Sequence, residues 1–303
     1  MSASSATSAP RWFIVVNLLS AIGFGLLSMT LCLPSMHEWS ELLNAPQADV
    51  QLTFSAFVVA FGIAQVVYGP LSDLYGRKRM LVIGFSIAIL ASLAAAWASG
   101  IWWLVIARFC QGAGAAAGLV IGRAMVQDFF AASDRARIMA YIGMAMGLCP
   151  PLGTIVGGQV HVVFGWRANF LIAAAVAVII LALVVLCLPG GRPERSQNHW
   201  LKEIATAYGV LMRERLYVGF VAILSMCTGT FYVFLAGAPS VLAGYGVGPA
   251  EIGWYIMFIP LSYIVGSFLT SRLLRYIPEN RLMTLGLSSS LTGTLLVLAL
   301  ALA

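Results

Sequence analysis

Apolar residues follow one another in nine long runs along the chain, and short polar segments separate the runs. Most runs are close to the ~20 residues that a helix needs to cross a hydrocarbon core about 30 Å thick. Helices are favoured over a barrel, because barrel strands would be about half as long and would alternate in polarity. The pattern predicts nine membrane helices, over residues 12–36, 50–70, 80–99, 101–127, 138–160, 167–188, 217–240, 252–271 and 282–303.

The longest polar stretch, residues 189–216, divides six predicted helices from the remaining three. Such a stretch is typical of a linker between two bundles. We expect an N-terminal six-helix bundle in residues 1–188, a cytoplasmic linker, and part of a second bundle in residues 217–303. Because the chain stops at Ala303 inside an apolar run with no polar flank, we also expect it to be C-terminally truncated.

The composition agrees with a membrane protein, since 61% of the residues are hydrophobic and only 9% are charged. Soluble globular chains carry about 25% charged residues. If the N-terminus is cytoplasmic, 15 of the 17 Lys and Arg residues fall in cytoplasmic segments. The positive-inside rule therefore predicts a multi-pass inner-membrane protein with a cytoplasmic N-terminus. The net charge of +6 reflects this topology and not a nucleic-acid partner.

The residue types that bind metals or form covalent intermediates are scattered. Five cysteines fall singly inside apolar runs, with no paired spacing, so the sequence predicts neither a disulfide framework nor a zinc site. An enzyme would need a nucleophile and a base, or metal ligands, at one membrane depth. We find no such set, and we expect no enzyme activity, no bound metal and no cofactor.

The segment GPLSDLYGRKR, residues 69–79, joins the second and third predicted helices on the cytoplasmic side. Gly69 and Gly76 permit a sharp turn, and Asp73 is an acid at the membrane face. Asp128, at the cytoplasmic end of the fourth helix, is placed to pair with Arg77 across the bundle. The simpler alternative is a basic loop with no further role.

The fourth predicted helix contains a cation, Arg108, inside an apolar run. Because a charge at the bilayer centre costs about 2.5–3.5 kcal/mol or more, we expect Arg108 to face a cavity and to bind substrate. Gln111 follows three residues later and shares its helix face. Small residues four apart let helix backbones approach closely, so packing alone is an equally open interpretation of the glycines on this helix, Gly112, Gly114, Gly118 and Gly122.

The fifth predicted helix carries two adjacent prolines among five glycines, in GMAMGLCPPLGTIVGG. Pro150 and Pro151 remove backbone donors and bend a helix, whereas Gly153 and Gly157 remove side-chain bulk. The segment predicts a hinge or a tight crossing of two helices.

Other polar residues within the predicted helices are weaker candidates for the substrate cavity. Each has an alternative as a packing residue or as an interfacial anchor. The candidates that we retain are Asn17 and Thr30 in the first helix and Tyr232 in the seventh.

Three motifs together resemble those of the bicyclomycin and chloramphenicol resistance branch of the drug:proton antiporters, in the major facilitator superfamily. The motifs are GPLSDLYGRKR, RxxQGxGAAxG with GRAMVQD, and CPPLGTIVGG. The resemblance implies twelve helices in two halves, a small-molecule substrate near the midplane and alternating access by rocking of the halves. It implies a monomer in the lipid bilayer that uses the proton gradient to export drugs. It also implies that Asp73, Arg77 and Asp128 form a latch that closes the cytoplasmic side in one state.

The acidic residues of this chain differ in position from those of the drug:proton antiporters that it resembles. Antiporters of this branch carry an acid in the first helix, in a segment resembling DMYLP, whereas here the matching stretch is TLCLP, with Thr30 at the acidic position. No Asp or Glu lies in the central part of any predicted helix, and all three histidines lie in loops or at helix ends. Proton coupling would then use Asp73 and Asp128 or an acid outside this chain. A metabolite importer and a truncated, non-transporting membrane protein stay open as alternatives.

Overall fold

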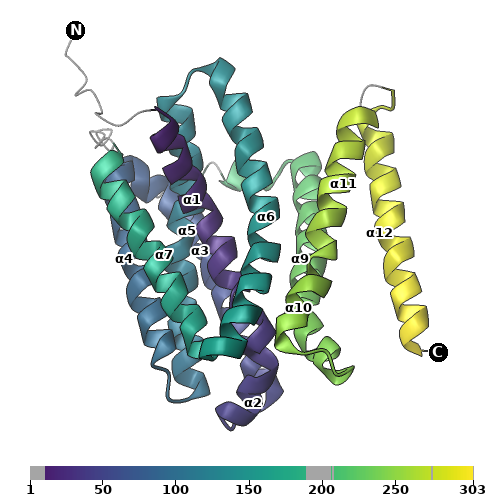
Figure 1. Ribbon diagram of the computed structural model, residues 1–303. Helices are drawn as coiled ribbons and strands as arrows, with labels where there is room; N and C mark the ends of the chain where they lie inside the picture. The colour runs from purple at the N-terminus through teal and green to yellow at the C-terminus, as the bar shows by residue number, and fades with distance from the viewer. Residues whose placement is uncertain (1–10, 189–205, 207, 274–275, 303) are drawn as a thin grey trace. The chain divides into compact units, whose positions relative to one another are not determined.

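The computed structural model of the protein describes residues 11–188, 206, 208–273 and 276–302, and all regular secondary structure within them is helical (Figure 1). Nine helical segments of this described part are long and apolar enough to cross a membrane. This confirms both the fold class and the number of helices that the apolar runs predict.

Residues 1–257 form one compact unit and residues 258–303 a second. The helices of the first unit are α1 (Arg11–Thr30), the 3₁₀ helix η1 (Leu33–Glu38), α2 (Trp39–Leu42), α3 (Gln47–Tyr75), α4 (Arg77–Ala96), α5 (Ile101–Phe129), α6 (Ala132–Phe164), α7 (Trp166–Cys187), α9 (Arg215–Gly244) and α10 (Pro249–Ile256). The second unit contains α11 (Phe258–Leu273) and α12 (Glu279–Leu302). The linker expected at residues 189–216 lies largely outside the described residues and stays a prediction.

Two predicted features differ in the structure. The turn expected over residues 69–79 is confined to Gly76, which has φ +96°, because α3 runs on through Pro70 to Tyr75 and α4 begins at Arg77. A membrane helix tolerates proline where neighbouring helices and polar groups satisfy the freed backbone. The single helix expected over residues 252–271 is divided into α10 and α11 at Met257.

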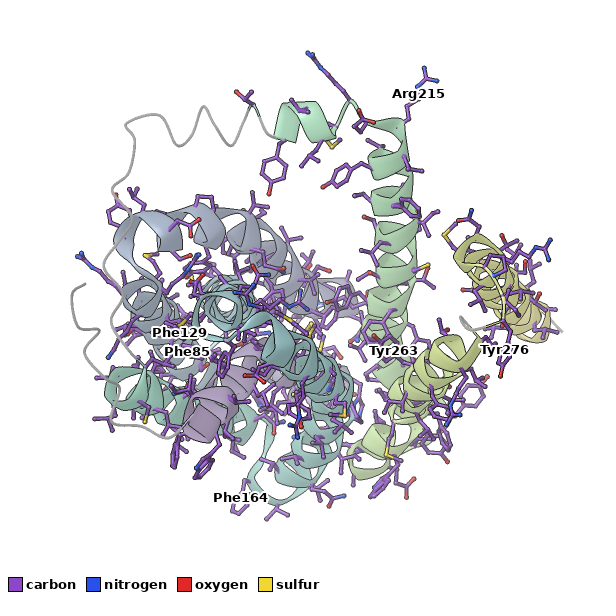
Figure 2. The ribbon with its side chains drawn as sticks, turned by 90° about the horizontal axis from the view of Figure 1, so that it is seen from above. Phe85, Phe129, Phe164, Arg215, Tyr263 and Tyr276 are labelled. Atoms are coloured by element: carbon purple, nitrogen blue, oxygen red, sulfur yellow. The ribbon has the colours of Figure 1, made fainter. Side chains whose placement is uncertain are left out.

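Helix α5 lies at the centre of the first six membrane helices and packs against α1, α3 and α4. A Cβ added at Gly112 would overlap the carbonyl of Phe57 on α3, and one at Gly118 would overlap the carbonyl of Ala21 on α1. Viewed from above, Phe85 of α4 lies inside this group of helices and Phe164 of α6 lies at its edge (Figure 2). Small residues on α5 therefore bring three neighbouring backbones into contact with it.

Helix α6 crosses the end of α1 through a second set of small residues. Pro150 and Pro151 lie within the continuous helix and do not end it. One and two turns later, Gly153 lies against the hydroxyl of Thr30 and Gly157 against the carbonyl of Leu31, with no room for a Cβ at either position. Of the two structures that the sequence predicts for this segment, a tight crossing is present. A hinge stays a prediction.

The end of the bundle that carries η1 and α2, called the η1 end here, joins the first six membrane helices to α9 and α10. Gly158 of α6 lies against the backbone carbonyl of Pro249, and Gly253 of α10 lies against the backbone of Thr154 and Ile155. The Gln47 amide donates to the Ser240 hydroxyl at 2.9 Å, which links α3 to α9. These contacts lie within the first compact unit, so α9 and α10 close against the six-helix group at this end.

The crossing of α6 on α1 predicts that Gly157→Ala destabilises the protein by about 1–3 kcal/mol, the usual cost of overpacking, because the new methyl group would overlap the carbonyl of Leu31. The midpoint of thermal unfolding in detergent would fall accordingly. Gly143→Ala on the same helix is the control, since a Cβ there meets open space and alanine favours a helix by up to about 1 kcal/mol over glycine. Equal unfolding midpoints for the two variants would contradict the crossing.

Candidate functional site

A buried guanidinium holds the last turn of α1. Arg108 of α5 is 0% exposed. Its Nη1 donates to the carbonyl of Ser28 at 3.2 Å, and its Nη2 lies 3.4 Å from the carbonyl of Met29. Carbonyls in the last turn of a helix have no partner within the helix and carry its partial negative charge. The cation therefore interacts favourably with the end of α1.

A chain of hydrogen bonds continues from Arg108 to α4. Arg108 Nη1 donates to Gln111 Oε1 at 2.6 Å, and Gln111 Nε2 donates to the Ser92 hydroxyl at 2.7 Å. Ser92 donates in turn to the carbonyl of Ala88 at 2.7 Å. All three side chains are buried, so each depends on the next for a partner. The chain ties α1, α5 and α4 together by polar contacts inside the membrane.

Two aromatic rings cover the guanidinium. Arg108 Cζ lies 4.3 Å from the ring centroid of Phe57 on α3 and 5.9 Å from that of Phe170 on α7. Both distances are within the range of a cation–π attraction, which is stronger when water is excluded. Arg108 makes no ion pair with a carboxylate anywhere in the described part of the chain. Carbonyl dipoles and ring faces stabilise its positive charge without neutralising it.

The other residues that we expected at the substrate cavity lie in different places. Thr30 is buried beside α6, and its hydroxyl donates to the carbonyl of Leu26 at 2.9 Å. Asn17 lies thirteen positions before Thr30 on α1, about 20 Å away at 1.5 Å per residue, and its buried amide has no hydrogen-bond partner among the described residues. Tyr232 of α9 packs edge-on to Phe54 of α3, with ring centroids 6.4 Å apart. Only Arg108, Gln111 and Thr30 gather near the end of α1.

The Arg77 cluster, defined as Asp73, Arg77 and Asp128, comes together as the sequence suggested. Arg77 Nη1 lies 2.5 Å from Asp73 Oδ1, and Arg77 Nε donates to Asp128 Oδ2 at 3.2 Å. Arg77 Nη1 also donates to the buried hydroxyl of Ser72 at 2.6 Å. Gly76 brings Arg77 within reach of the two acids by its positive φ. A Cβ added at Gly69 would lie 3.9 Å from the side chain of Val120 on α5. The cluster links α3, α4 and α5 at the end opposite η1.

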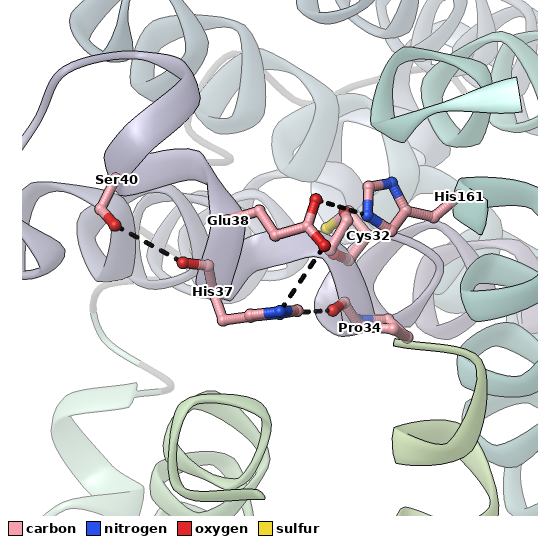
Figure 3. A network of polar contacts seen from close by, with 7 residues as sticks. Cys32, Pro34, His37, Glu38, Ser40 and His161 are labelled. Carbon is pink, nitrogen blue, oxygen red and sulfur yellow. Dashed lines mark hydrogen bonds and ion pairs between the residues drawn. The ribbon is translucent and has the colours of Figure 1, made fainter. Parts of the chain in front are cut away.

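Three features of the structure were missed by the sequence analysis. Ser92 and Phe57 lie in apolar runs with nothing to mark them as partners of Arg108. The third feature is a hydrogen bond between His161 Nε2 and Glu38 Oε2 at 2.9 Å, although 123 positions separate the two residues (Figure 3). The one available signal was that both residues lie at the same predicted end of their helices.

Comparison with known proteins gives one family for almost the whole chain. The family model described as Major Facilitator Superfamily matches residues 9–303. The chain is 26% identical to the bicyclomycin resistance protein homolog of Haemophilus influenzae, over 88% of this chain and 68% of that protein. It is 25% identical to a chloramphenicol resistance protein of Pseudomonas aeruginosa, over 97% of this chain and 70% of that protein.

Solved structures show the same fold. A bacterial homologue of the human lysosomal transporter Spinster, in an inward-facing and unoccupied conformation, has a TM-score of 0.71 at 13% identity, over 91% of this chain and 65% of that one. The chain thus spans about two thirds of the length of the proteins that it matches.

The hydrogen-bond chain predicts that Gln111→Leu destabilises the protein by about 1.5–3 kcal/mol, the range for a hydrogen bond to a charged group, because it leaves one donor of the buried guanidinium without its acceptor and removes the bond that Ser92 accepts. Thermal or denaturant unfolding in detergent measures the loss. Gln65→Leu on α3 is the control, since Gln65 is partly exposed and makes no hydrogen bond among those described. An unfolding free energy that Gln111→Leu leaves unchanged would mean that the chain of bonds adds no stability.

Proposed function

Because the chain belongs to the Major Facilitator Superfamily, we propose that it exports drugs or other small amphipathic molecules across the inner membrane by proton antiport. As a member it is a multi-pass membrane transporter for small molecules and not an enzyme. The proposal adds the direction of transport, the class of substrate and the proton as the source of energy. It also adds a cytoplasmic N-terminus, which the distribution of Lys and Arg supports.

One observation carries the proposal, namely that α6 crosses α1 at the turn that Arg108 holds. Gly153 and Gly157 belong to the CPPLGTIVGG segment, which resembles a motif of exporters. Gly153 packs on Thr30, and Gly157 packs on Leu31. Arg108 binds the carbonyls of Ser28 and Met29 in the turn just before. A rearrangement of α6 would therefore move the segment of α1 that lies beside the buried charge. The named functions of the two bacterial resistance proteins support export.

The charge of Arg108 supports a class of substrate. Its guanidinium is sealed in this conformation and has no carboxylate partner among the described residues, so its positive potential extends to groups nearby. We infer that the substrate has an apolar body and an anionic or electron-rich group. Arg108, Gln111 and Thr30 line its path in this proposal, whereas Asn17 and Tyr232 contact it at other depths.

The Arg77 cluster is proposed as a gate on the cytoplasmic side. Its ion pairs are partly exposed, and Asp73 and Asp128 approach Arg77 from two different helices. Pairs of this kind add little to stability, so they exchange partners at small cost when the helices move. Gly69 and Gly76 would permit that movement, and the proline segment at Pro150 and Pro151 would act as a second hinge.

A metabolite importer of the same fold is the second candidate. The D-xylose–proton symporter has a similar fold, with a TM-score of 0.62 at 16% identity, but that likeness concerns the fold alone. Uptake and efflux of one substrate in inverted and right-side-out vesicles distinguish the two directions. Export requires accumulation in inverted vesicles when their interior is made acidic.

We expect expression of this protein to confer drug resistance on a pump-deficient bacterial strain, and Arg108→Ala to remove that resistance. A loss of about 1.4 kcal/mol in interaction with the transported molecule would slow transport tenfold. Arg123→Ala on the same helix is the control, because Arg123 is exposed and its one hydrogen bond within the described part of the chain is to the sulfur of Met146. Amounts of protein in the membrane are compared by blotting. Equal resistance with Arg108→Ala would contradict a role for this charge in transport.

The gate proposal predicts that Asp128→Asn changes the free energy of unfolding by about 1 kcal/mol or less, as for other exposed ion pairs, yet slows transport severalfold. The cause is the lost charge opposite Arg77 Nε. Unfolding in detergent and drug efflux from cells are measured on the same variant. Asp134→Asn, a change of an exposed acid at the start of α6, controls for the loss of one negative charge. Normal efflux by Asp128→Asn would rule out the gate.

A further inference from the structure

Two histidines flank one carboxylate on the η1 end of the bundle (Figure 3). Glu38 Oε2 lies 2.9 Å from His161 Nε2, and Glu38 Oε1 lies 3.7 Å from His37 Nε2. The exposed side-chain fractions are 20% for His37, 38% for Glu38 and 8% for His161. The cluster is therefore open to solution at His37 and closed at His161.

His161 contacts Glu38 through one of its two ring nitrogens. Its Nε2 faces the Glu38 carboxylate and so carries the proton that it donates. Its Nδ1 is buried and has no hydrogen-bond partner among the described residues. A second proton would place a buried N–H donor at Nδ1 with no acceptor, which is unfavourable. His161 thus anchors Glu38 by one hydrogen bond without needing a charge.

His37 lies between two acceptors. Its Nδ1 lies 2.9 Å from the carbonyl of Pro34, which accepts a hydrogen bond from it. Its Nε2 faces the carboxylate of Glu38 at the distance of an ion pair. Both ring nitrogens therefore face acceptors, and a proton added to the ring would place its positive charge beside the carboxylate. A neutral His37 that keeps its bond to Pro34 would turn a lone pair toward the carboxylate.

We propose that His37, with Glu38 as its counter-ion and His161 as the anchor of Glu38, is a proton-binding site on the outer face of the transporter, and that a bound proton favours closure of that face. This inference rests on the export function proposed above for its biological meaning. The ligand of the site is the hydrogen ion. No Asp or Glu lies near the middle of a membrane helix in the described part of the chain. Arg108 cannot bind a further proton, because a guanidinium is always protonated, whereas a histidine ring in this cluster can bind one.

The position of η1 connects the site to closure. η1 carries His37 and Glu38 and packs against α2, α3, α6, α9 and α10. It therefore lies where the six-helix group meets the next two helices, beside the contacts of Gly158 with Pro249 and of Gln47 with Ser240. Loss of the proton would set the His37 lone pair against Glu38 and loosen η1. The closed form then binds the proton more tightly than the open form, so its population falls as pH rises.

Other titratable groups lie on the elements that pack against η1. In the described residues, only His37 and His161 make an ion pair or a hydrogen bond with the Glu38 side chain. Histidine is the unperturbed side chain that changes charge between about pH 5 and about pH 8. The remaining groups of these elements toward the η1 end are Glu41 of α2, Asp49 of α3, Tyr232 of α9, Tyr245 just after it, and Glu251 and Tyr255 of α10.

The test measures closure directly, without a substrate. Spin labels are placed at Leu42→Cys, the last residue of α2, and at Tyr245→Cys, just after α9, after serine replaces the five native cysteines; both positions are exposed and lie at the η1 end. Pulsed electron–electron double resonance on the protein in liposomes gives the distribution of distances between the two labels. We expect the ratio of short to long distances to be severalfold higher at about pH 5 than at about pH 8, where histidine is neutral.

Two variants separate proton binding from simple packing. His37→Gln keeps a donor for Pro34 but takes no proton, so the pH dependence should disappear. His161→Gln keeps a donor for Glu38, so the pH dependence should remain. A pH dependence that His37→Gln leaves intact, or its absence in the parental protein, overturns the proposal.

If His37→Gln does not reach the membrane, Glu38→Gln serves in its place. The loss of the counter-ion should shift the transition to lower pH, and an unshifted transition overturns the proposal. The distance measurement tests the proton site without a transported molecule. The efflux assay on the same proteins tests the export function, so failure of one proposal is distinguished from failure of the other.

Discussion

The close approach of α5 to its neighbours is the constraint on which the rest of the six-helix group depends. In a bilayer no hydrophobic force drives helices together, because lipid tails are as apolar as leucine, so contact must come from packing and from polar bonds. Gly112 and Gly118 let the backbones of α3 and α1 touch α5, and Gly114 does the same for α4. At larger separations Arg108 would not reach the carbonyls of α1 and Gln111 would not reach Ser92.

The buried charge follows from that approach and also explains where α1 ends. A guanidinium without a carboxylate partner needs acceptors, and carbonyls become available where a helix stops. α1 stops at Thr30, and the carbonyls of its last turn accept from Arg108. The ring of Phe57 covers the cation and excludes water. The end of the first helix, the glycines of α6 and the charge of α5 therefore form one connected arrangement.

The sequence predicted the features that depend on neighbouring positions. Run length gave the nine membrane helices, and the spacing of three placed Gln111 beside Arg108. The sequence did not predict the tertiary partners of Arg108 and Gln111, because Ser92 and Phe57 look like ordinary residues of apolar runs. The turn expected over residues 69–79 is shorter in the structure, since the rule that proline ends helices comes from soluble proteins and α3 continues through Pro70. The pair of Glu38 and His161 depends on the crossing of α6 over α1, which no local pattern gives.

A single stretch of chain links the two charged sites that the proposals require. From Ser28 to Glu38 the chain passes from the turn that Arg108 binds, through the contacts of Thr30 and Leu31 with α6, into η1 with His37 and Glu38. A change of charge at η1 therefore acts on the same segment as the field of Arg108, although the two groups do not touch. Coupling of this kind needs no carboxylate at the midplane, because the helix end itself transmits the displacement. The threonine found where related antiporters carry an acid is then compatible with proton-driven transport.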